Sequence, residues 1–82
     1  MYEVEFSKLA EKQFYKLERT LQDRIVAILE RCRVRPHAHA KKLVESPYFR
    51  LRAGDYRIII DIKEDKLIVF VIELGHRKKI YK

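Results

Sequence analysis

The stretch that decides the fold runs from residue 48 to residue 74 and reads YFRLRAGDYRIIIDIKEDKLIVFVIEL. β-Branched and aromatic residues fill three runs within it, and turn residues separate the runs, which predicts an antiparallel meander. Gly54 can adopt the positive φ that a tight turn between the first two strands requires. The run 67–74 is apolar on both faces, which is typical of a central strand, and Gly75 is expected to end that strand.

The segment before the meander carries one strand pattern and then two helix patterns. Residues 2–6 alternate between apolar and polar, which indicates a short strand. Apolar residues then recur at helical spacing, which predicts a helix over roughly residues 7–18 with Ser7 as its N-cap. A second helix is expected to begin at Thr20, to place Cys32 in its apolar stripe, and to end before Pro36.

Together these elements predict an α+β fold, with an N-terminal strand and a helical hairpin packed on one face of a small antiparallel sheet. The short link between the two helices favours an antiparallel hairpin. Residues 35–47 read as an exposed basic loop. The length of 82 residues supports one modest core, so residues 1–82 are expected to form a single domain.

The charge is the strongest signal in the composition. The formal net charge is +7 and the pI is about 9.7, which suggests a polyanionic partner: nucleic acid, an anionic membrane or an acidic protein. A basic surface without any partner is the alternative. No apolar run has the length of a membrane span, and the N-terminus lacks the pattern of a signal peptide. The single cysteine suits a cytoplasmic location.

Familiar catalytic motifs are missing from the sequence. It contains no Ser-His-Asp set, no Cys/His cluster, no phosphate-binding glycine loop and no carboxylate pair with an obvious partner. His37 and His39 offer two nitrogen ligands without a third group nearby, so an exposed loop is favoured over a metal site. Cys32 is expected to be a small core residue rather than a nucleophile. We therefore expect no metal and no cofactor.

Arginines at the edges of the meander indicate a different kind of chemistry. If the helices cover the face that carries Leu51 and Ile58, then Arg50, Arg52 and Arg57 project from the opposite face or its rim. Guanidinium groups bind phosphate oxygens bidentately and stay charged at any relevant pH. Such a surface suits cleavage of RNA by its own 2′-hydroxyl group, because the protein then needs only to align the phosphate and stabilise charge.

Two residues near the end of the chain could complete that chemistry. His76 is the group near the arginines whose ordinary pKa suits proton transfer, and Tyr81 could stack on a base, orient the phosphate or relay a proton. Each has a structural alternative. Arg52 and Arg57 could pair with nearby aspartates, His76 could hydrogen-bond a turn, and Tyr81 could pack on the sheet edge.

Two sequence elements carry a resemblance to a known family. They read Tyr48-x-Arg50-Leu51-Arg52-Ala53-Gly54-Asp55-Tyr56-Arg57 and Gly75-His76-Arg77-x-x-x-Tyr81. With the order of strand, two helices and strands, nearly the whole chain resembles the RelE/ParE superfamily of toxins from toxin–antitoxin modules, and RelE most of all. The resemblance implies a metal-independent ribonuclease that cuts mRNA in the ribosomal A site by attack of the 2′-hydroxyl group.

The resemblance also implies roles for individual residues. Arg57 and Arg77 match the two arginines that stabilise the phosphate, and Tyr81 matches the C-terminal tyrosine. RNA-binding roles fall to Arg50, Arg52, Lys78 and Lys79. A second catalytic lysine of the family has no counterpart here, because Tyr48 and Phe49 occupy its region. That difference leaves the general base open between His76 and a ribosomal group, and it allows for reduced activity.

The expected partners follow from the same resemblance. They are a cognate RelB-like antitoxin protein, whose amphipathic segments neutralise the basic site, and the ribosome with its mRNA. No membrane partner is expected. Two alternatives to the nuclease stay open. One is a ParE-like toxin that poisons DNA gyrase without nuclease activity, and the other is a degenerate toxin that acts as a basic binding module.

Overall fold

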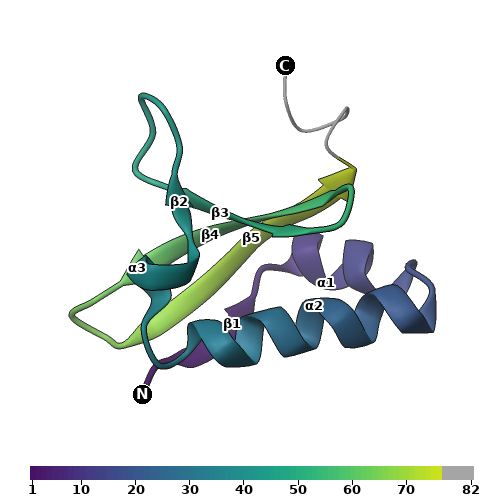
Figure 1. The fold of residues 1–82 in the computed structure, drawn as a ribbon, viewed down its shortest axis with the longest axis horizontal. Coiled ribbons are helices and arrows are strands. Elements are labelled where there is room, and N and C mark those ends of the chain that lie inside the picture. The colour runs from purple at the N-terminus through teal and green to yellow at the C-terminus, as the bar shows by residue number, and fades with distance from the viewer. Residues whose placement is uncertain (77–82) are drawn as a thin grey trace.

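The computed structural model describes residues 1–76 and contains a five-stranded sheet with two longer helices on one face (Figure 1). The strand order across the sheet is β1-β5-β4-β3-β2. The predicted α+β fold is confirmed. Along the chain the elements are β1 (Glu3–Phe6), α1 (Lys8–Tyr15), α2 (Arg19–Cys32), α3 (Pro36–His39), β2 (Lys41–Lys42), β3 (Phe49–Ala53), β4 (Tyr56–Lys63) and β5 (Ile68–His76).

The N-terminal strand β1 lies at one edge of the sheet and runs parallel to β5. The backbone N–H of Glu3 donates to the carbonyl of Leu67 at 2.8 Å, and that of Ser7 donates to Val71 at 2.9 Å. Parallel strands need a long connection, and most of the chain lies between these two. The sequence predicted an antiparallel sheet, which holds for β2 to β5 but is wrong for the β1–β5 pair.

Ser7 begins α1 and also fastens it to the sheet. Its hydroxyl accepts a hydrogen bond from the N–H of Ala10 at 3.0 Å, as expected of an N-cap, and donates to the carbonyl of Ile72 at 2.7 Å. The second helix starts at Arg19, one residue before the predicted cap Thr20. Glu18 takes the N-cap position there without a side-chain hydrogen bond. Only the first of the two predicted caps is therefore present.

Replacing Ser7 with alanine should lower the free energy of unfolding by about 1–2 kcal/mol, because the variant loses the helix cap and the bond to β5 together. In a domain of this size each kcal/mol corresponds to about 4–8 °C in melting temperature, which calorimetry can measure. Thr20→Ala is the matched control and should change stability by less than about 0.5 kcal/mol. Equal losses in the two variants would contradict the assigned cap.

The core lies between the helices and the sheet, where α1 packs against β5 and α2 against β3. Cys32 is fully buried in it, as predicted. Burial raises the pKa of the Cys32 thiol from 9.0 to about 11, so the thiol stays protonated near neutral pH and is no nucleophile. The fully buried side chains with the largest volume come from both layers: Ile25, Cys32, Ile58, Ile60, Val69, Val71 and Leu74.

The segment predicted as a basic loop, 35–47, contains a short helix and a short strand. Pro36 stands at the start of α3, where its missing N–H and fixed φ suit a helix N-terminus. Lys41 and Lys42 form β2 and pair with β3. The prediction of a loop is wrong here, because pairing with a distant strand leaves no local pattern in so few residues.

The meander forms as predicted, with two local differences from the sequence pattern. Gly54 has a φ of 61° in the β3–β4 turn, which explains the glycine. However, β5 continues through Gly75 to His76, so the predicted end of this strand is wrong. Ile59 pairs with Glu73 whereas Ile60 pairs with Val71, so Ile72 is an extra residue in β5, a β-bulge.

Candidate nucleic-acid interface

The meander places Arg57 on the side of the sheet turned away from α1 and α2, which we call the far face. Residues directly opposite each other in an antiparallel pair point to the same side. Arg57 in β4 lies opposite Arg52 in β3 and Gly75 in β5. The next residue, Ile58, points toward the helices and is fully buried in the core. Arg52 and Arg57 therefore leave the far face as neighbours, in agreement with the sequence alternation.

Arg57 is the only charged side chain among residues 1–76 that is buried, with 6% of its surface exposed. Its Nε and Nη1 atoms are enclosed. The sequence predicted a side chain that projects from the far face or its rim; it does leave this face but is buried there, because β4 is the central strand, with a strand on each side. A guanidinium stays charged when buried, at a desolvation cost of the order of several kcal/mol. Such a residue is a poor choice for stability and marks a candidate functional site.

Two further basic residues extend this site along the far face. Arg50 lies on the same side of β3 as Arg52, two residues earlier, and Lys41 of β2 lies opposite Arg50. We call Lys41, Arg50, Arg52 and Arg57 the basic patch. Lys41 was not among the predicted site residues, because nothing in the sequence shows that it pairs with β3. Guanidinium and ammonium groups gathered on one face can bind successive phosphates of a nucleic acid.

The far face carries opposite charges toward its two edges. On β1, Glu3 and Glu5 are exposed and share a side with Ile68 and Phe70 of β5. The basic patch lies toward the β2 edge. The loop between β2 and β3 also rises on the side away from the helices (Figure 1). A polyanion would therefore be attracted to the β2–β3 side and repelled from β1.

His76 lies on the opposite side of the sheet from Arg57. It is paired with Tyr56, and the two rings meet edge to face with their centroids 5.8 Å apart. Both residues line a cleft of about 390 Å³ together with Gln13 of α1 and Lys16, which follows that helix. A proton carrier at this position would have to reach a phosphate on the far face around the end of the sheet. The structure therefore does not bring His76 together with Arg57.

The structure also bears on the alternative partners proposed for Arg52 and for the histidines. Within residues 1–76 no ion pair joins Arg52 to an acid, and Asp61 instead pairs with Lys63 at 3.4 Å. The Nε2 atom of His37 lies 2.5 Å from a carboxylate oxygen of Glu64, and its ring packs edge to face on Phe49.

In the described part of the chain, no cluster of three or more histidine, cysteine, aspartate or glutamate side chains could hold a metal ion. No helix there has the length and apolar character that a bilayer span requires.

Four of the predicted site residues lie outside the described residues: Arg77, Lys78, Lys79 and Tyr81. Their convergence on Arg57 therefore stays a prediction.

Comparison with known proteins gives a consistent family. The model of the ParE toxin of type II toxin–antitoxin system, parDE, matches residues 4–81. The mRNA interferase toxin RelE of Escherichia coli strain K12 is 30% identical over 81 residues, which cover 95% of this chain and 85% of that protein.

Solved structures agree with this family. A chain in the intact E. coli RelBE toxin–antitoxin complex superposes with a TM-score of 0.81 at 28% identity, covering 93% of this chain and 96% of that one. A chain in the RelB–RelE antitoxin–toxin complex from Methanococcus jannaschii gives a TM-score of 0.73 at 27% identity, with 95% of each chain covered. The similarity thus spans nearly the whole chain in sequence and in structure.

Proposed function

The chain belongs to the ParE toxin family, within the RelE/ParE superfamily of type II toxin–antitoxin systems, and on that premise we propose that it is a ribosome-dependent endoribonuclease that cuts mRNA. The observation that carries this proposal is the buried Arg57 beside Arg52 on the far face. A gyrase poison needs no enclosed guanidinium, whereas a nuclease without a metal needs fixed positive charge at the scissile phosphate. The name of the RelE relative supports the same activity.

The proposed reaction uses the 2′-hydroxyl group of the substrate as the nucleophile. A base removes the proton of the 2′-hydroxyl group and its oxygen attacks the adjacent phosphorus. The bond to the 5′-oxygen breaks, and that oxygen takes up a proton from water, so that a 2′,3′-cyclic phosphate and a 5′-hydroxyl end form. Arg57 and Arg77 stabilise the negative charge that develops on the phosphate, and Tyr81 orients the phosphate or a neighbouring base. Arg50, Arg52, Lys78 and Lys79 bind the backbone on either side.

The general base is assigned to the ribosome rather than to this chain. Tyr48 and Phe49 occupy the region of the missing family lysine, and Tyr48 is 38% exposed. His76 points to the helix side of the sheet, away from Arg57. Within this proposal a ribosomal group at the bound mRNA supplies the base, so cleavage is expected to require the ribosome.

We also propose that a RelB-like antitoxin is the cognate protein partner. The similar solved structures include antitoxin–toxin complexes. A net charge of +7 favours a partner of opposite charge. Within this proposal, the antitoxin covers the basic patch and blocks access of RNA.

The decisive experiment is cleavage of ribosome-bound mRNA in vitro, with the wild type compared to Arg77→Ala. The wild type should give breaks in phase with the codons. Arg77→Ala should cleave about 10²–10³-fold more slowly, because one charge on the transition state is no longer neutralised. Free mRNA serves as the control for ribosome dependence. Full activity of Arg77→Ala would refute the assigned mechanism.

The second candidate is a ParE-like toxin that poisons DNA gyrase, because the matching family model is that of the ParE toxin. Under that alternative, induction should leave mRNA intact and impair DNA supercoiling. A degenerate binding module would do neither, and arrest of growth on overexpression would count against it.

A further inference from the structure

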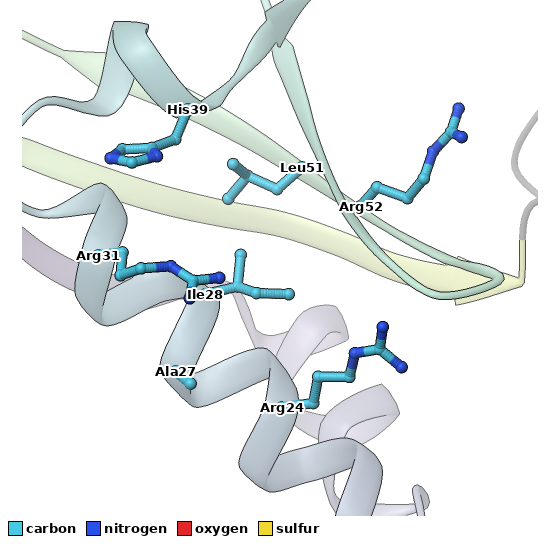
Figure 2. Close-up of a pocket in the computed structure, with 7 residues that line it drawn as sticks. All are labelled: Arg24, Ala27, Ile28, Arg31, His39, Leu51 and Arg52. Carbon is cyan, nitrogen blue, oxygen red and sulfur yellow. The ribbon is translucent and has the colours of Figure 1, made fainter.

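A cleft of about 430 Å³ opens between α2 and β3, at the edge of the sheet (Figure 2). Four of its lining residues lie on one face of α2, and the others come from α3 and β3. Figure 2 shows Arg24 extending from α2 toward the end of β3, Arg31 extending along α2, and His39 on the opposite wall. Among residues 1–76 the lining consists of Arg24, Ala27, Ile28, Arg31, His39, Leu51 and Arg52.

Among the described residues, the lining of the cleft is cationic and contains no acidic side chain. Within residues 1–76 the side chains of Arg24, Arg31 and Arg52 form no ion pair and no hydrogen bond. Arginines elsewhere on the same helix and just after it are neutralised. Arg19 pairs with Asp23 at 3.1 Å, and Arg33 pairs with Glu30 at 3.0 Å. Charge is therefore left uncompensated at this cleft, which raises its attraction for an anion.

The Arg24 side chain is also held in place by a contact with the β3–β4 turn. A Cβ atom at Gly54 would lie 3.3 Å from Nη1 of Arg24, so the guanidinium rests against the β3–β4 turn. Gly54 thus leaves room for this side chain as well as supplying the positive φ of the turn. A guanidinium held against the turn needs less ordering to bind a ligand than a freely rotating one.

We propose that this cleft binds the sugar–phosphate backbone of RNA, as a second site beside the basic patch. Arg52 belongs to both, since it projects from the far face and also lines the cleft. A strand of RNA that crosses the basic patch can therefore continue around the edge of β3 to Arg24 and Arg31. The proposal deepens the proposed function and rests on it, in that the chain must act on RNA.

The lining favours RNA over an acidic peptide as the occupant. A peptide helix gains much of its affinity from apolar side chains placed in an apolar groove. Here the apolar floor is small, because Leu51 is only 3% exposed and Ile28 is half-buried. Recognition must then come from charge and from bidentate hydrogen bonds, which guanidinium groups make to phosphate.

The test measures binding without cleavage. The ligand is a fluorescent RNA oligonucleotide with 2′-O-methyl sugars, which lacks the nucleophile and is long enough to cross both sites. The double variant Arg24→Gln/Arg31→Gln should bind at least about 10-fold more weakly, and the slope of log K against log salt should fall by about 1.4, as expected for two lost phosphate contacts. Both arginines are exposed, so the melting temperature should stay close to that of the wild type.

The matched control is Lys8→Gln/Lys12→Gln on α1, which removes the same charge from exposed positions outside the cleft. This variant should bind within about 3-fold of the wild type and keep its salt slope. Equal losses in both double variants would mean that net charge alone drives binding, and would overturn the proposal. The proposal would also be overturned if the wild type bound a polyglutamate peptide through Arg24 and Arg31 while the Arg24→Gln/Arg31→Gln variant bound RNA as tightly as the wild type. Because the RNA cannot be cleaved, either result is independent of the nuclease assay with Arg77→Ala.

Discussion

Arg57→Lys should cleave ribosome-bound mRNA about 10²–10³-fold more slowly than the wild type while it keeps the positive charge. The reason is geometric. Arginine presents a rigid planar fork that holds two phosphate oxygens at once, and lysine presents a point charge on a flexible stem. Arg57 is 6% exposed, so water cannot take the place of the lost donors. Single-turnover cleavage with saturating ribosomes would measure the loss in the chemical step.

Arg52→Lys is the matched control, because Arg52 lies directly opposite Arg57 on the same face and is exposed. The lysine should still contact the RNA backbone, so the cleavage rate should fall by less than about 3-fold, as expected for a solvated charge. Thermal melting of both variants would separate a loss of catalysis from a loss of fold. If Arg57→Lys cleaves as fast as Arg52→Lys, then Arg57 does not hold the reacting phosphate.

The sequence predicted the meander and its basic side well, because both follow from local alternation. Leu51 and Ile58 fall on the helix side and Arg52 and Arg57 on the far face, as period-two patterning requires. Ser7 was equally predictable, since a serine before an apolar helical stripe is a common N-cap. These features depend on residues close together in the sequence.

Features that depend on distant pairing were not predictable. The parallel β1–β5 pair joins Glu3 to a partner at Ile68, and β2 exists because Lys41 and Lys42 lie beside β3. The burial of Arg57 follows from the position of β4 at the centre of the sheet, which the sequence of β4 alone does not give. Arg24 and Arg31 share a helical face by their spacing, but the cleft requires β3 to lie opposite that face.

The bulge in β5 is the feature with the largest consequence for the site. Val71 and Leu74 are both fully buried on the helix side, although three positions separate them, and strict alternation would put one of them on the far face. The extra residue Ile72 restores the match, and its carbonyl accepts the hydrogen bond from Ser7. After the bulge, Glu73 and Gly75 share the far face with Arg57, and His76 turns toward the helices.

Leu74→Ala tests that register and should lower the free energy of unfolding by about 2–5 kcal/mol, because Leu74 is 1% exposed and its removal leaves a cavity. Leu67→Ala is the matched control at the start of the same segment. Leu67 is 48% exposed, so its loss should be less than about 0.5 kcal/mol. Chemical denaturation measures the free energy of unfolding of both variants.

Without the bulge, Leu74 would face away from the helices, and its truncation would hardly change the free energy of unfolding. Nearly equal stabilities of the two variants would therefore remove the reason for placing His76 and Arg57 on opposite sides, and would return His76 to the candidates for the general base.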